Sequence, residues 1–133
     1  MSPCFFVPMS SSRIIHIHNL DNASQTPLQI KYCKSFLCRL RGLTFKRELA
    51  PTEGLLLVQQ RDSRLETAIH MFFVSFDLTV LWIDSSLTVV DKVLAKSWRP
   101  AYTPKKAAQY ILEIHPERWD DFEIGNQVQF EDV

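Results

Sequence analysis

The sequence predicts a mainly β fold: an antiparallel sandwich or a partly closed barrel of seven to eight short strands, with one or two short helices. Three observations support this. Most apolar segments alternate with a period of two, as half-buried strands do. Turn-forming residues separate these segments at short intervals. Helices and strands do not alternate as they do in βαβ units. The 133 residues are enough for one domain: a mobile tail over 1–12 and a single β-rich domain over 13–133.

The first two predicted strands form a hairpin. Isoleucines alternate with His16 and His18 just after Arg13, and apolar residues alternate with polar ones again over 28–32. The sequence NLDNASQTP between them is rich in turn-forming residues. The apolar run 55–58 is a further predicted strand, and 65–72 alternates as the next.

The second half of the chain supplies the remaining strands. Segment 78–83 is apolar on both faces, which predicts a central strand, and 78–95 forms a hairpin. Segments 107–114 and 127–131 alternate and complete the sheet. Pro100 and Pro104 lack backbone donors, which excludes the loop that contains them from a sheet interior.

Two short helices are expected. Apolar residues spaced by three and four predict one over 34–41, which Gly42 can end. A helical turn is expected to start at Pro116. The residues predicted to form the core are Ile30, Leu37, Leu40, Leu56, Ile69, Val80, Trp82, Tyr110, Leu112 and Val128.

Composition and charge narrow the function classes. Lysine and arginine number 15, as do aspartate and glutamate, so the net charge is zero. A protein that binds nucleic acid generally carries a basic excess, so no nucleic-acid role is expected. No apolar run is long enough to span a membrane. The N-terminus has no basic residue before its short apolar run, which predicts a cytoplasmic protein rather than an exported one.

The three cysteines predict neither a disulfide nor a metal site. No CxxC pair is present. On a helix, Cys33 and Cys38 would lie about 140° apart and would not share a face. Reduced, buried cysteines are therefore expected.

Several short motifs occur in a fixed order: RGL at 41–43, EGLLL at 53–57, IHMFF at 69–73, SWRP at 97–100 and YILEI at 110–114. In this order and spacing the chain resembles the domain of unknown function 192 family of bacterial and archaeal proteins. The resemblance implies the fold outline. It implies no biochemistry, because that family has no established general activity.

The chain departs from the family pattern at several positions. Ser97 precedes Trp98-Arg99 where relatives often have proline, and the HPERW segment lacks a glycine that is usual in the family. Thr79 stands where members of the family usually carry an aspartate, and Gly125-Asn126 stands where they usually have Gly-Asp. If the aspartate is structural, threonine is a neutral substitute and Arg41 needs another acceptor, such as Glu53 or Glu113. If it is functional, this chain has lost the activity of the family.

Four residues are the candidates for ligand binding: Arg41, His70, Trp98 and Arg99. An aromatic residue beside an arginine in a proline-containing loop is typical of a recognition surface. Each residue also has a structural interpretation. Arg41 can hold carbonyls together, His70 can satisfy a backbone group in the core, and the loop of Trp98 can plug one end of a barrel.

His16 and His18 point to the same side of a strand, which makes them a feasible metal pair. A third ligand would have to come from elsewhere, with His70 or His115 as candidates. A solvated strand face is the favoured interpretation, so neither a metal site nor a cofactor is predicted. Positive charge gathers from Lys31 to Arg47 and negative charge after Glu113. This polarity favours pairing within the fold, with an anion-binding or partner-docking patch as the alternative.

Taken together, the sequence predicts a small non-catalytic module that binds a small polar ligand or a protein partner. One alternative is a small enzyme acting on a sugar or another polar molecule through His70, Arg41, Glu53 and Arg99. Another is a structural subunit of a larger assembly. Two or more titratable groups in one pocket would favour the enzyme, and an exposed apolar patch would favour the assembly.

Overall fold

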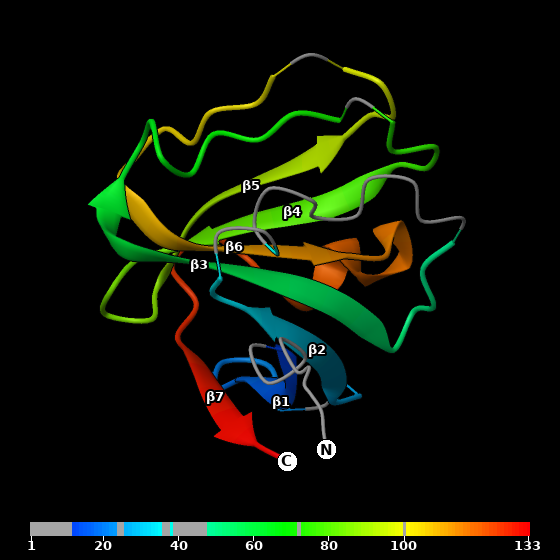
Figure 1. Ribbon diagram of the computed structural model, residues 1–133. Helices are drawn as coiled ribbons and strands as arrows, with labels where there is room; N and C mark the ends of the chain where they lie inside the picture. The colour runs from blue at the N-terminus through cyan, green and yellow to red at the C-terminus, as the bar shows by residue number, and fades with distance from the viewer. Residues whose placement is uncertain (1–11, 24–25, 36–37, 39–47, 72, 100) are drawn as a thin grey trace, which may run out of the picture.

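In the described residues, the fold is a seven-stranded sheet with the short helix of residues 116–121 packed against it, as the computed structural model shows (Figure 1). The structure describes residues 12–23, 26–35, 38, 48–71, 73–99 and 101–133. Its elements are β1 (Ser12–Asn19), β2 (Leu28–Cys33), β3 (Glu53–Ser63), β4 (Leu78–Ile83), β5 (Val89–Ala95), β6 (Ala108–Ile114), the 3-10 helix η2 (Pro116–Asp121) and β7 (Val128–Asp132).

The strand order is β5-β4-β6-β3-β2-β1-β7, and the sheet is mixed. The mainly β class is confirmed, as are the β1–β2 and β4–β5 hairpins. All neighbouring strands are antiparallel except β2 and β3, which are parallel. A parallel pair needs a crossover between its strands, and the long connection from Cys33 to Glu53 provides it.

The sheet does not close into a barrel. Its edge strands β5 and β7 do not pair along their length, but the residues at their starts meet. Val89 donates its N–H to the carbonyl of Asn126, and Val128 donates to that of Leu87, both at 2.9 Å. Neither the sandwich nor the barrel is confirmed: the described residues form one strongly curled, open sheet.

The predicted strand over 65–72 is wrong. Ala68 donates its N–H back to the carbonyl of Leu65, so the chain turns there instead of staying extended. Of the described residues in this segment, only Ile69 forms a bridge, with Tyr102 of a second loop. The apolar residues of this segment alternate because Ile69 and Met71 anchor a loop in the core, and not because the segment belongs to the sheet.

Hydrophobic residues cover one face of the whole sheet and the part of the other face that β2 to β6 form. One cluster, here called the inner cluster, contains residues from every strand together with Phe122, which follows η2. Its members are Ile15, Ile17, Leu28, Ile30, Leu56, Val58, Leu81, Ile83, Val89, Leu112, Ile114, Phe122 and Val128. The other cluster, here called the outer cluster, lies on the opposite face, beneath the loops of residues 64–77 and 96–107. Its members are Cys33, Leu49, Leu55, Leu57, Ile69, Met71, Val74, Leu78, Val80, Trp82, Ala95, Ala108 and Ile111. Of the predicted core, Ile30, Leu56, Ile69, Val80, Trp82, Leu112 and Val128 are buried. Tyr110 is half-buried, and Leu37 and Leu40 lie outside the described residues.

The prediction of reduced cysteines is corrected by a disulfide between Cys33 and Cys38, whose Cα atoms are 5.6 Å apart. Cys33 is the last residue of β2, so the angular argument for two residues of one helix does not apply to this pair. Most of the predicted helix over 34–41, and the tail up to residue 11, fall outside the described residues. The helical turn at Pro116 is confirmed as η2.

Candidate functional site

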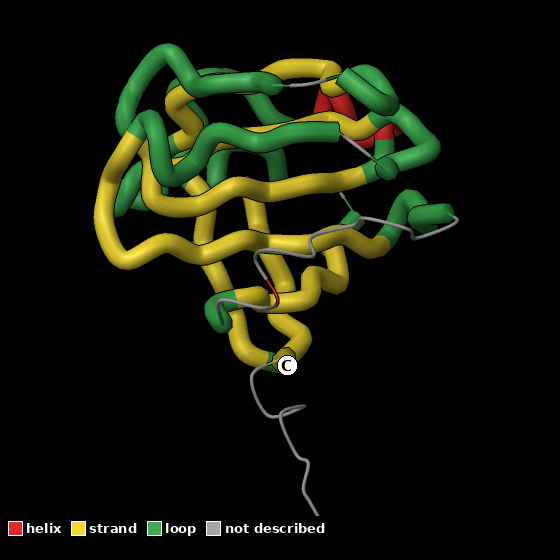
Figure 2. The backbone as a smooth tube through the Cα atoms, turned by 45° about the horizontal axis from the view of Figure 1, so that its top comes forward, coloured by secondary structure: helices red, strands yellow, loops and turns green. Residues whose placement is uncertain are grey.

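Two loops that cover the outer cluster are joined into one surface layer. The first spans 64–77 and the second 96–107, and they run side by side on one side of the sheet (Figures 1 and 2). Ile69 and Tyr102 exchange two backbone hydrogen bonds of 2.9 Å. Met71 donates its N–H to the carbonyl of Arg99 and accepts from the N–H of Trp98, again at 2.9 Å. Met71 itself is buried in the outer cluster, which anchors the layer.

Two exposed aromatic rings meet on this layer. Phe73 and Trp98 have ring centroids 5.1 Å apart, in an edge-to-face arrangement. Their exposed fractions are 49% and 53%. Both residues have a positive φ, 63° and 65°. Large side chains rarely adopt this conformation, and it costs on the order of 1–3 kcal/mol per residue. The fold therefore holds two bulky rings at the surface in spite of a local backbone penalty.

Three of the four predicted ligand-binding residues come together here. His70 lies between the two residues that bond to the second loop, and Trp98 and Arg99 lie on that second loop. All three are exposed. Exposure excludes a buried core histidine at position 70, and it excludes Trp98 as a plug. Arg41, the fourth residue, lies outside the described part of the chain, as does most of the basic segment from Lys31 to Arg47.

Glu53, one of the candidate catalytic residues of the alternative enzyme, has another role in the structure. Its carboxylate accepts a hydrogen bond from the N–H of Ala50 at 2.9 Å, and its own N–H donates to the carbonyl of Ala50 at 3.1 Å. Glu53 thus stabilises the turn that leads into β3.

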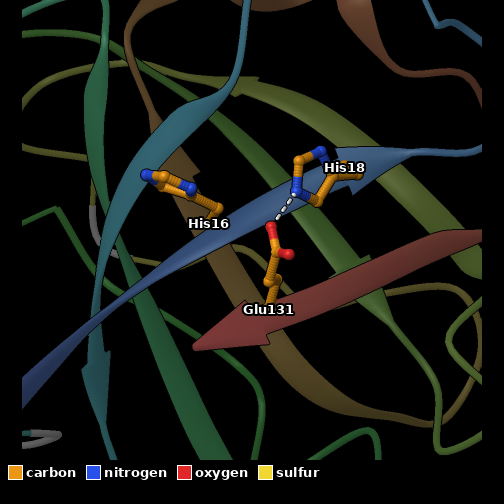
Figure 3. A group of neighbouring side chains, drawn as sticks. All are labelled: His16, His18 and Glu131. Atoms are coloured by element: carbon orange, nitrogen blue, oxygen red, sulfur yellow. Dashed lines mark hydrogen bonds and ion pairs between the residues drawn. The ribbon is translucent and has the colours of Figure 1, made fainter. Parts of the chain in front are cut away.

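A second cluster lies on the outer side of β1 and β7. His16 pairs directly with Glu131 across the two strands, and His18 is two residues further along β1. Figure 3 shows the three side chains close together, with the His18 Nε2 atom 2.9 Å from Glu131 Oε1. The sequence indicated the two histidines but suggested His70 or His115 as the third member. His115 instead caps η2 through its Nδ1 atom, which accepts from the N–H of Glu117.

A surface hollow of about 390 Å³ adjoins this cluster. His18 and Glu131 form part of its wall, so both residues belong to the cluster and to the hollow. Its full lining is His18, Asn19, Leu20, Asn22, Ala23, Pro27, Gln129 and Glu131.

Glu113 and Thr79 are two polar side chains of the sheet that are buried. The burial of Glu113 was not predicted, whereas Thr79 belongs to the segment 78–83 that the sequence predicted to be a central strand. Glu113 on β6 is 6% exposed, and burial raises the pKa of its carboxyl from 4.5 to about 7. Thr79 on β4 is fully buried, and its hydroxyl has no hydrogen-bond partner among the described residues. Glu113 alternates with inward-facing residues, but the end of β6 is buried on both faces, so the alternation pattern does not reveal its burial.

The family model for domain of unknown function 192, described as uncharacterized ACR, matches residues 16–130. The chain belongs to this family. The resemblance read from the sequence motifs is therefore confirmed.

Curated relatives are UPF0127 proteins from archaea. The Thermococcus kodakarensis protein is 46% identical over 85 residues, covering 64% of this chain and 52% of the relative. The Thermococcus sibiricus protein is 35% identical over 106 residues, covering 77% and 66%. The chain thus spans about half to two-thirds of the length of these relatives.

Solved structures share the fold at low identity. A proposed transcription regulator from Sinorhizobium meliloti matches with a TM-score of 0.76 and 17% identity, covering 90% of this chain and 93% of that one. A Novosphingobium aromaticivorans protein of unknown function matches with a TM-score of 0.74 and 12% identity, covering 97% and 93%. At this identity the matches establish the fold alone. In the described residues, no helix has the length and apolar character needed to span a membrane.

Proposed function

We propose that this domain is a non-catalytic binding module that takes a small polar ligand on the layer formed by its two paired loops. The observation that carries the proposal is the exposed pair of Phe73 and Trp98, with both residues in the left-handed backbone region. Backbone strain of this kind is concentrated at functional sites, where the surrounding structure maintains it.

Hydrogen bonds tie the backbone around the pair together. The backbone bonds between the loops fix Met71, Trp98 and Arg99 relative to one another. Asp77 holds the start of the second loop by accepting the N–H of Ser97 at 3.0 Å. A surface that is already ordered loses little conformational freedom when it binds.

The chemistry of this surface suits a ligand with a flat face and polar edges. An exposed indole can stack against the apolar face of a pyranose ring, because that face carries C–H groups and the aromatic face is electron-rich. Arg99 offers donors to oxygen atoms of the ligand. A simple sugar is therefore the first ligand to test.

Tryptophan signals provide a built-in test, because the chain has three tryptophans in different settings. Trp82 is buried and donates its Nε1–H to the carbonyl of Thr67, and Trp119 stacks under the Lys92 ammonium. Methyl glucoside and methyl N-acetylglucosaminide should be titrated at millimolar concentration into ¹⁵N-labelled protein. The indole signal of Trp98 should shift, and those of Trp82 and Trp119 should stay in place.

Two substitutions complete the experiment. Trp98→Ala should abolish saturation transfer from the protein to the sugar. Leu65→Ala, which removes another exposed apolar side chain of the first loop, should leave the transfer unchanged. If neither sugar shifted the Trp98 indole signal, a sugar ligand would be refuted. Saturation transfer that survives Trp98→Ala would refute the location of the site.

The remaining predictions about cellular context stay predictions: a cytoplasmic location, no cofactor and no nucleic-acid partner. The disulfide between Cys33 and Cys38 bears on the first of these. Disulfides persist mainly in oxidising compartments, so an exported protein is the competing possibility. Fractionation of cells with an antibody against the domain decides between the two.

A further inference from the structure

We propose that His16, His18 and Glu131 form a binding site for a divalent metal ion of borderline softness, with Zn²⁺ as the first choice. The proposal is independent of the loop surface described above. It rests on the position of the three side chains, on their donor atoms and on the hollow beside them.

Strand pairing fixes the three Cα positions. β1 and β7 are antiparallel, with His16 directly opposite Glu131 and His18 opposite Gln129. Directly opposed residues and their diagonal neighbours lie close enough for their side chains to meet on one face. Ile15 and Ile17, which alternate with the histidines, are buried in the inner cluster. The histidines therefore share the outer face of β1, and Glu131 reaches that face from β7 (Figure 3).

The candidate ligand atoms already lie near one another. One nitrogen from each imidazole and one carboxylate oxygen are all within 4.8 Å of each other. Ligands of a tetrahedral zinc ion lie about 3.4 Å apart, as bond lengths of about 2.1 Å require. Side-chain rotations on the fixed strands can make up the difference. The two rings are almost perpendicular, with an interplanar angle of 89°, and their centroids are 6.2 Å apart.

The donor set indicates the class of metal and the openness of the site. Two imidazoles and one carboxylate are the protein ligands of several zinc sites and of many mononuclear iron(II) sites. Three protein ligands leave at least one coordination position for water or a small molecule. His18 and Glu131 are also part of the wall of the 390 Å³ hollow, so a molecule in the hollow has access to a bound ion.

The ion is not expected to be needed for folding. His16 and His18 are half-buried and Glu131 is exposed, and none of the three lies in either hydrophobic cluster. Removal of metal with a chelator should therefore leave the protein folded. This separates the proposed site from a structural zinc site, whose loss unfolds the domain.

Metal affinity should be measured by calorimetry on untagged protein that has been stripped with chelator and dialysed, with Zn²⁺ and Co²⁺ as probes. One ion should bind per chain, and Co²⁺ should develop a visible absorption band. His16→Gln, His18→Gln and Glu131→Gln should each raise the Kd by about tenfold or more, since even the outer-shell partners of metal ligands contribute roughly 10–100-fold. Asp132→Asn is the matched control, because Asp132 is the next residue of β7 and pairs instead with Arg13. It should leave the Kd unchanged.

Wild-type protein supplies a second readout in case a variant does not fold. In ¹⁵N spectra of the imidazole side chains, Zn²⁺ should shift one nitrogen of His16 and one of His18, and the signals of His70 and His115 should not move. If all four variants bound Zn²⁺ with the wild-type Kd, the proposal would be overturned. Zinc-induced shifts confined to His70 and His115 would overturn it too. The absence of binding at submillimolar Zn²⁺ would overturn it as well.

Discussion

Replacing Thr79 by valine should stabilise the protein, and the same replacement at Thr67 should destabilise it. Both threonines are 0% exposed, so the comparison holds burial and chemistry constant. They differ in their hydrogen bonds. The hydroxyl of Thr67 donates to the carbonyl of Ser63 at 2.5 Å, whereas the hydroxyl of Thr79 has no partner in the part of the chain that the structure describes.

The magnitudes follow from this difference. A buried hydroxyl without a partner costs about 1–3 kcal/mol of folding free energy, because it loses its bonds to water and gains none. Valine has nearly the same shape as threonine, so Thr79→Val should raise the free energy of unfolding by about 1–2 kcal/mol. Thr67→Val leaves the Ser63 carbonyl without its donor and should lower the free energy of unfolding by about 1 kcal/mol.

Urea denaturation followed by circular dichroism measures both variants against the wild type, with the m-value checking that the unfolding transition is comparable. The two substitutions should change the free energy of unfolding in opposite directions. If Thr79→Val lowered stability as much as Thr67→Val, the hydroxyl of Thr79 would have a partner in solution, such as an internal water. The account of Thr79 as an unsatisfied group would then be refuted.

Two further predictions concern β6. Leu112 is fully buried in the inner cluster, so Leu112→Ala should lower the free energy of unfolding by about 2–5 kcal/mol, and a loss below about 0.5 kcal/mol would contradict its placement. Burial raises the pKa of Glu113 from 4.5 to about 7, so folding takes up a proton between these values. The associated stability is fully present below pH 4.5 and is lost as the pH rises toward 7, by roughly 3 kcal/mol in total. Glu113→Gln should flatten this slope in denaturation curves recorded across the range, and an unchanged slope would assign it to other groups.

Local sequence patterns predict most of the strands and the two hairpins, β1–β2 and β4–β5, but not the pairings between strands that are distant in the chain. Period-two alternation identified β1, β2, β6 and β7, and apolar content identified β4, because these features reflect burial on one face or on both. The parallel pairing of β2 with β3 has no local signal, since it depends on where a long crossover returns the chain. The alternation over 65–72 misled because anchoring a loop through Ile69 and Met71 gives the same pattern as a strand.

The candidate sites were also predictable only as far as local sequence patterns reach. The spacing of His16 and His18 predicts a shared face, but Glu131 is 113 positions from His18 and joins them only through the pairing of β1 with β7. The loop residues His70, Trp98 and Arg99 were identified by their chemistry. The left-handed backbone of Phe73 and Trp98 could not be expected, since large side chains disfavour it.

The pairing of β1 with β7 also sets a condition on how the chain folds. β1 lies between β2, its neighbour in sequence, and β7, which joins it from more than a hundred residues away. The β1–β2 hairpin can form early, but one edge of β1 stays open until β7 has docked. Ordering so long an intervening segment is entropically costly, which predicts slow folding. Until β7 arrives, the open edge can capture a strand of another molecule, so the yield of refolding should fall as protein concentration rises.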